Sequence, residues 1–243
     1  MLVERIQSID VLHHEPPYSA AYLAEQGLTG LNVGCSFWNI RPGSLNVDLS
    51  KLESPSGHST AYGRLSLLDA RFHYLEYDVT TPLPLPDASF EWLHSEHLIE
   101  HISQAGAIRF LKEAHRVLKP GGLLRISTPD LAIYVDGYRD PSRKFFNKHA
   151  RMIEQISRMF PDPDEPFPEV QERPAWMVNQ IFKFWGHQWI YDFEEMVYVL
   201  REAGFDERSI ERTSFRKGRD PKVSEIDLVV HRDETLYVEA IRT

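Results

Sequence analysis

Residues 90–130 read FEWLHSEHLIEHISQAGAIRFLKEAHRVLKPGGLLRISTPD and decide the fold class. The stretch begins and ends with short apolar runs typical of buried strands, FEWLHS and LLRISTPD. Between them, apolar residues from Ile108 to Leu118 recur at helical spacing, and Pro120 followed by two glycines is a helix stop. The pattern predicts one helix that begins directly after the first strand. Strand, helix and strand in this order predict an α/β protein with a parallel sheet.

Three further strand patterns precede this unit, and a loop separates the last two of them. Residues 51–66 are polar, without a clear period, and read as the loop. The three strand patterns are LTGLNVGCS (28–36), SLNVDLS (44–50) and ARFHYLEYDVT (70–80).

The C-terminal part returns to regular patterns. DFEEMVYVLREAGF (192–205) predicts a helix, because Asp192 and Glu195 form a capping-box pattern and Gly204 can end the helix. The last strands are predicted in SIERTSF (209–215), EIDLVVH (225–231) and TLYVEAIRT (235–243). An exposed C-terminal strand could pair with a second copy of the chain, as in a homodimer.

Residues 131–185 interrupt the alternation of strands and helices and are interpreted as an insertion. The stretch PDPDEPFPEVQERP (161–174) contains five prolines and five acidic residues, which predicts an extended surface loop. The segment WMVNQIFKFWGHQWIYD (176–192) then gathers aromatic residues around His187. It would either cover a substrate pocket or anchor the insertion to the rest of the chain.

Composition excludes several classes of protein. The 243 residues fit one domain and carry a formal net charge of −9 without a Lys/Arg run, so nucleic acid is not expected as a partner. One cysteine, Cys35, allows neither an intrachain disulfide nor a cysteine-based zinc site, and it fits a reducing, cytoplasmic location. No apolar stretch reaches the roughly 18 residues of a membrane span, and the first ten residues are too charged for a signal peptide.

Two acidic residues that follow predicted strands are candidates for binding a nucleotide. Asp48 ends the second strand, where an acidic side chain can accept hydrogen bonds from ribose hydroxyls. Asp78 follows the third strand and could bind an exocyclic amine, or could only cap a turn. Fourteen positions separate Gly34 from Asp48, which is too short for a helical crossover once both strands are allotted. Trp38 in this short connection would cover a cofactor or fill the space of the absent helix.

These patterns in this order resemble the class I S-adenosylmethionine-dependent methyltransferases, over roughly residues 28–130 and 186–243. Within that superfamily, the compressed LNVGCS…PGSLNVDLS is similar to a bacterial branch of predicted methyltransferases. The resemblance implies a Rossmann-like α/β fold with a seven-stranded, mostly parallel sheet. It also implies a single methyltransferase domain over 1–243, in which 131–185 form a helical and aromatic lid after the fifth strand, covering the substrate.

The resemblance implies S-adenosyl-L-methionine as the cofactor and assigns residues to it. Asp48 would hold the ribose, Asp78 the adenine amine, and Glu96 the methionine end. Ser36 departs from the family, which usually has a glycine there. The implied cofactor-binding residues are Val33, Gly34, Cys35, Ser36, Asp48, Leu49, Asp78, Val79, Ser95, Glu96 and His97.

Two histidines are the catalytic candidates, because a hydroxyl acceptor needs a base near neutral pH. His187 lies in the aromatic segment, and His101 lies four residues after His97, which would place both on one side of the same helix. Such a pair can hold a metal, but no third ligand is evident and no metal is expected. His101 could equally pack beneath the site.

The sequence therefore predicts a methyltransferase that acts on an oxygen of a small-molecule or glycan-type acceptor. The alternative is a domain that binds S-adenosylmethionine without catalysis and acts as a partner or scaffold. A nicotinamide oxidoreductase is disfavoured, because G-x-G-x-x-G is absent.

Overall fold

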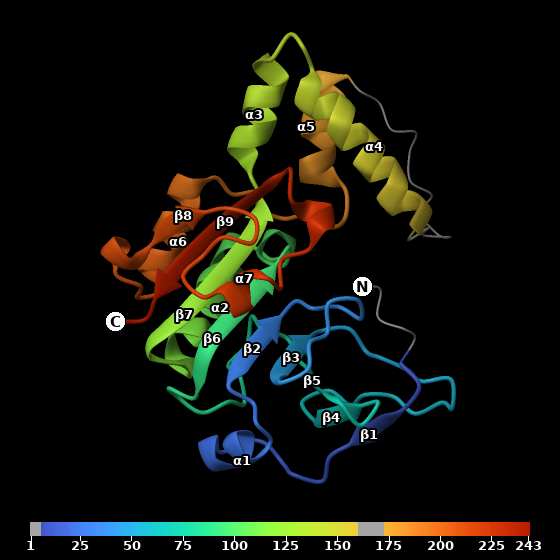
Figure 1. The fold of residues 1–243 in the computed structure, drawn as a ribbon, viewed down its shortest axis with the longest axis vertical. Helices are drawn as coiled ribbons and strands as arrows, with labels where there is room; N and C mark the ends of the chain where they lie inside the picture. Colours follow the sequence, from blue (N-terminus) through green and yellow to red (C-terminus); the bar gives the residue numbers. More distant parts are fainter. Residues whose placement is uncertain (1–5, 160–172) are drawn as a thin grey trace.

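The computed structural model describes residues 6–159 and 173–243, which are built around one mixed β-sheet (Figure 1). The strands lie in the order β1-β4-β5-β3-β2-β6-β7-β9-β8. Five adjacent strands in the middle run parallel to one another: β5 (Phe72–Glu76), β3 (Ser44–Asp48), β2 (Gly30–Val33), β6 (Phe90–Glu96) and β7 (Leu118–Pro129).

The parallel strands have the order of a doubly wound fold. Counted along the chain, they lie in the order third, second, first, fourth and fifth, and the direction of winding reverses between β2 and β6. The buried side chains of neighbouring strands lie side by side: Leu31 of β2 is paired with Leu45 of β3 and with Leu93 of β6. Strands buried on both faces account for the apolar runs in the sequence. The predicted α/β class and parallel core are confirmed.

Antiparallel strands extend the sheet on both sides and raise the number of described strands to nine, against the seven expected. On one side β4 (Leu65–Leu68) pairs with β5, and β1 (Ile9–Val11) pairs with β4. On the other side β9 (Thr235–Ile241) pairs with β7, and β8 (Glu211–Thr213) pairs with β9. The C-terminal strand therefore lies inside the sheet, so the expectation that it is an exposed edge strand is wrong, and a homodimer stays a prediction.

Two helices lie on the core. The second begins where its capping signal predicts, whereas the first does not begin directly after β6 as predicted, because the short helix η1 (Ile99–His101) comes between them. α2 (Gln104–Val117) begins at Ser103, whose side chain accepts the Gly106 N–H. α6 (Phe193–Glu202) begins at Asp192, whose carboxylate accepts the Glu195 N–H at 2.9 Å, and packs against α2. The remaining short helices are α1 (Ala20–Glu25), α7 (Pro221–Ser224), η2 (Glu207–Ser209) and η3 (Val229–His231).

Three local predictions are wrong. Residues 51–66 are not entirely loop, because Leu65 and Ser66 open β4, which pairs with β5 as an antiparallel hairpin. The segment 225–231 forms turns and η3 rather than a strand. His97 and His101 do not share a helix: His97 has a left-handed backbone (φ 49°), and His101 ends the short helix η1 (Ile99–His101).

The segment after β7 forms a separate group of helices with a hydrophobic core of its own. Figure 1 shows α3 (Leu131–Arg139), α4 (Lys144–Met159) and α5 (Pro174–Lys183) together, beyond the end of β7. Tyr134, Phe146, Ile153, Met177 and Ile181 are the buried residues that join them. The proline- and acid-rich stretch predicted as an extended loop lies almost entirely outside the described residues.

Candidate active site

A cavity of about 450 Å³ opens at the carboxyl ends of β2, β3, β6 and β7. In doubly wound sheets this is the edge where ligands bind, at the point where the strand order reverses. The strand ends form one wall, and the group α3–α5 and the segment before β9 form the others. The lining residues include Gly34, Trp38, Asp48, Glu96, His97, His101, Tyr134, His149, Ile181, Trp185, His187, His231 and Glu234.

The loop after β2 is held against the end of β3. Gly34 has φ +72°, and a Cβ on it would lie 2.7 Å from the Leu98 Cβ, so the position needs glycine. The Asp48 Oδ2 accepts the Ser36 N–H at 2.8 Å, and the Asp48 Oδ1 accepts the Ser50 N–H at 2.8 Å. These two bonds fix the Asp48 carboxylate on the cavity wall.

Glu96 ends β6 with a buried carboxyl group. Its two oxygens accept the Leu228 N–H at 3.0 and 3.1 Å, and Asn39 Nδ2 donates to Oε2 at 3.4 Å. Burial raises the pKa of Glu96 to about 8, because desolvation disfavours the carboxylate more than these donors stabilise it. Glu96 is therefore largely protonated at neutral pH.

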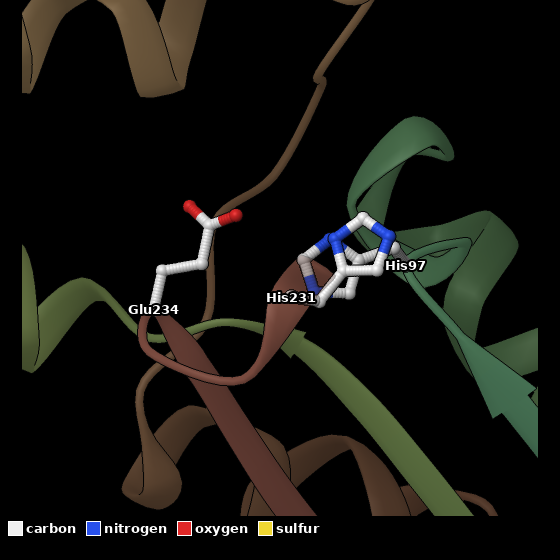
Figure 2. Close-up of side chains that lie close together, drawn as sticks. All are labelled: His97, His231 and Glu234. Atoms are coloured by element: carbon white, nitrogen blue, oxygen red, sulfur yellow. The ribbon is translucent and has the colours of Figure 1, made fainter. Parts of the chain in front are cut away.

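His97, His231 and Glu234 form one cluster in the cavity (Figure 2), with one ligating atom from each within 4.8 Å of the others. The rings of His97 and His231 are stacked, with centroids 3.8 Å apart. The Tyr134 hydroxyl donates to Glu234 Oε2 at 2.5 Å, and His149 Nε2 lies 3.3 Å from the same oxygen. This cluster therefore connects the end of β6 to the inserted helices.

Glu100, His101 and His187 form a second cluster, again with ligating atoms within 4.8 Å of one another. The rings of His101 and His187 meet edge to face, with centroids 4.8 Å apart. Burial lowers the pKa of His101 to about 4 and also lowers that of His187, so both rings are neutral at pH 7. Burial raises the pKa of Glu100 to about 8.

The cavity brings together seven of the residues predicted for the site from four separate segments. These residues are Gly34, Ser36, Asp48, Glu96, His97, His101 and His187.

The other predicted residues lie outside the cavity lining. Val33, Cys35, Val79 and Ser95 are buried, with Val33 and Ser95 inside strands β2 and β6. Leu49 is 63% exposed.

Asp78 also lies outside the lining and has the turn-capping role that the sequence left open. Its Oδ1 accepts both the Thr80 N–H at 2.9 Å and the Thr80 hydroxyl at 2.7 Å. Its side chain thus stabilises the turn after β5.

Sequence reasoning did not single out Tyr134, His231 or Glu234. Tyr134 comes from α3, and the other two lie in the segment before β9. Nothing local distinguishes them, because their neighbours in the cavity are distant in sequence; Thr235 Oγ1, next to Glu234, bonds to His97 across 138 residues. Trp38, whose role was open, lines the cavity and meets the His231 ring edge-on at 6.2 Å.

Comparison with known proteins identifies the family that this chain resembles. The family described as "Methyltransferase domain" matches residues 45–126, about a third of the chain. A probable S-adenosylmethionine-dependent methyltransferase of Mycolicibacterium smegmatis is 30% identical over 97 residues, which are 38% of this chain and 37% of the relative. One of Mycobacterium tuberculosis (strain H37Rv) is 36% identical over 75 residues, 31% of this chain and 27% of the relative. The resemblance seen in the sequence is confirmed, over a minor part of these relatives' own length.

Two solved methyltransferases align with most of this chain at low sequence identity. A SAM-dependent methyltransferase from Archaeoglobus fulgidus has a TM-score of 0.44 at 13% identity, covering 91% of this chain and 92% of its own. An S-adenosylmethionine-dependent methyltransferase from Mesorhizobium loti has a TM-score of 0.43 at 18% identity, covering 92% and 98%. Among the described residues, no helix is both long and apolar enough to cross a membrane.

Proposed function

We propose that this chain, whose residues 45–126 match the methyltransferase domain family, transfers a methyl group from S-adenosyl-L-methionine to an oxygen of a small-molecule or glycan-type acceptor. The observation that carries the proposal is the cavity at the carboxyl ends of β2, β3 and β6, with Asp48 on its wall. Its volume of about 450 Å³ is within the range of small-molecule sites, roughly 300–1,000 Å³.

The residues at the strand ends fit the ribose and methionine parts of the cofactor. Asp48 ends the second parallel strand, the position at which doubly wound folds bind ribose. Each Asp48 oxygen accepts one backbone N–H, so each keeps a lone pair for a ribose hydroxyl. Glu96 and His97 would border the methionine part, and Gly34 to Ser36 would pass beside it.

The adenine part would extend past the cavity lining toward Leu49, Asp78 and Val79. Both hydrogen bonds from Thr80 go to the Asp78 Oδ1, so Oδ2 remains to accept from the adenine amine. Val33, Cys35 and Ser95 would contribute backbone atoms, because their side chains are buried.

The inserted segment 131–185 would act as the lid of a single methyltransferase domain and would choose the acceptor. Tyr134 and Trp185 in this segment, and His187 just after it, bring aromatic and polar groups to the cavity. Aromatic side chains beside hydrogen-bonding groups suit either the apolar face of a sugar or a flat acceptor. The single cysteine, Cys35, is a buried free thiol, and we place the protein in the cytoplasm on that ground.

The acceptor hydroxyl would lie against His101 and His187. When bound, S-adenosylmethionine supplies a methyl carbon that forms a bond to the acceptor oxygen as its bond to sulfur breaks, with the electron pair staying on sulfur. The His187 Nδ1–H donates to the Ile181 carbonyl at 2.6 Å, so Nε2 carries the lone pair that takes the hydroxyl proton. The cavity walls align the reactants.

Calorimetry with S-adenosylhomocysteine, followed by transfer of labelled methyl to a panel of sugars, phosphorylated sugars and phenols, tests the proposal. Saturable binding and a methylated hydroxyl product are expected. Absence of binding at high protein concentration overturns the proposal and the non-catalytic alternative together. Binding without transfer to any oxygen, nitrogen or carbon acceptor favours the binding domain that acts as a partner or scaffold.

A further inference from the structure

We propose that Glu100, His101 and His187 bind a divalent transition-metal cation of the zinc type on the acceptor side of the cavity. Two imidazoles and one carboxylate are a donor set that holds such an ion while leaving coordination positions open. One ligating atom from each residue lies within 4.8 Å of the other two. Metal–ligand bonds of about 2.0–2.2 Å place two ligands of one ion within about 4.4 Å of each other, so small side-chain shifts complete the set.

The hydrogen bonds of both rings leave a lone pair for the cation. The His187 Nδ1–H donates to the Ile181 carbonyl, which makes Nε2 the unprotonated nitrogen of the neutral ring. His101 forms a ring hydrogen bond with the Trp185 backbone. Metal-bound histidines characteristically donate their second ring N–H to a backbone carbonyl or a carboxylate, which orients the ring.

The two oxygens of the buried Glu100 side chain differ in their partners. The residue is fully buried; Oε2 accepts from Thr128 at 3.0 Å, and Oε1 has no hydrogen-bond partner among the described residues. His97 Nδ1 lies 3.3 Å from Oε1. The Thr235 hydroxyl donates to the His231 carbonyl, so its oxygen accepts the His97 Nε2–H and leaves Nδ1 unprotonated.

A proton on Glu100 would satisfy only the contact with His97. A cation would satisfy Oε1 and the two remaining imidazole lone pairs together. The arrangement of acceptors therefore favours a bound cation.

Hydrogen bonds to backbone carbonyls hold the two halves of the cluster in place. Gln188 N and Trp189 N donate to the Glu100 carbonyl at 2.7 and 3.2 Å, and Gln188 Nε2 donates to the His101 carbonyl at 2.8 Å. The segment that carries His187 is thus attached directly to η1, 87 residues earlier in the chain.

The neighbouring cluster of His97, His231 and Glu234 in Figure 2 has a less suitable arrangement. Its two rings stack face to face, the His97 Nε2–H is committed to Thr235, and Glu234 Oε2 already accepts from Tyr134. Because it lies in the same cavity, it supplies a matched control.

The role of the cation, though not its binding, rests on the proposed function. Bound to the two imidazoles, it would coordinate the acceptor oxygen and lower the pKa of the hydroxyl, whose proton would then leave to solvent water. In the cation-bound state His101 and His187 would be ligands. This role would replace that of His187 as proton acceptor in the metal-free chain, and His187→Ala lowers methyl transfer in either case.

Titration of the chelator-treated full chain with Co²⁺, followed by visible absorption and calorimetry, tests the site. A single Co²⁺ per chain with ligand-field bands of an imidazole-bound ion is expected. Glu100→Gln and His187→Ala should each weaken binding by about tenfold or more, while His231→Ala and His149→Ala should leave it unchanged. Thermal unfolding of each variant verifies that it folds, and His187→Asn replaces His187→Ala if the latter does not.

Absence of stoichiometric Co²⁺ binding by the folded chain overturns the proposal. Loss of binding in His231→Ala with retention in His187→Ala also overturns it and assigns the cation to the cluster in Figure 2. Binding of S-adenosylhomocysteine is measured separately. If the chain binds Co²⁺ but not S-adenosylhomocysteine, the metal site is supported and the proposed function is overturned. If it binds S-adenosylhomocysteine but not Co²⁺, the metal site is overturned and the proposed function is unaffected.

Discussion

Asp48 and Ser36 join the ends of two neighbouring parallel strands: the Asp48 Oδ2 accepts the Ser36 N–H at 2.8 Å. Ser36 has φ 47°, in the left-handed region that favours glycine, and this bond holds the loop after β2 in that conformation. The same carboxylate is the proposed ribose ligand. It therefore connects the shape of the loop with recognition of the cofactor.

Asp48→Ala should weaken binding of S-adenosylhomocysteine at least about tenfold, because hydrogen bonds to a charged group contribute about 1.5–3 kcal/mol each. Calorimetry measures the change. Asp48→Asn keeps one acceptor oxygen and should show an intermediate loss. Wild-type affinity in Asp48→Ala would remove Asp48 from the cofactor site.

His187→Ala should leave the affinity for S-adenosylhomocysteine within about twofold and lower methyl transfer by roughly a hundredfold or more, the usual contribution of a proton acceptor. His187 lies on the side of the cavity formed with the inserted helices, away from Asp48 on the strand side. Tyr138→Ala, at a 55% exposed position on α3, is the control and should preserve both quantities. Lost cofactor binding with unchanged turnover at saturation would move His187 to the cofactor side.

Arg125→Met should lower the free energy of unfolding by about 3–5 kcal/mol, because it leaves buried carboxylates without their cation. Arg125 is fully buried and bonds to Asp227 at 2.6 and 2.8 Å and to Glu239 at 2.8 Å. Urea denaturation gives the change. The control Lys119→Met breaks an exposed pair with Glu91 and should cost less than about 1 kcal/mol. Equal losses of unfolding free energy in the two variants would contradict the expectation that a buried ion pair costs more to break than an exposed one.

Glu96→Gln should flatten the dependence of stability on pH. The pKa of Glu96 is about 8 in the folded chain against 4.5 for an ordinary glutamate, so folding favours the protonated form. Its contribution to stability is complete below pH 4.5 and declines as the pH rises to about 8, with a slope of up to about 1.4 kcal/mol per pH unit. Unfolding curves between pH 5 and 8 should show wild type losing this stability relative to Glu96→Gln; parallel curves would refute the raised pKa.

Local sequence signals predicted the parallel core, the helix α6 and the end of α2 correctly. Strand and helix periodicity, the cap at Asp192 and the stop at Pro120 act through neighbouring residues, so they can be read without the fold. Asp48 was found in the same way, because the end of a parallel strand is itself a position in the sheet.

The sequence by itself therefore determined the fold class, the family resemblance and the strand-end wall of the candidate site. Tertiary structure alone decided the antiparallel strands, the internal place of β9 and the two histidine clusters. Strand pairing at the edges depends on hydrogen bonds between distant segments, as for Ile9 of β1 and Leu68 of β4. The side chains of Glu100 and His187 meet because hydrogen bonds from the backbone of residues 188 and 189 to the Glu100 carbonyl hold the two segments together. A periodic pattern in the sequence cannot indicate a contact between residues so far apart in the chain.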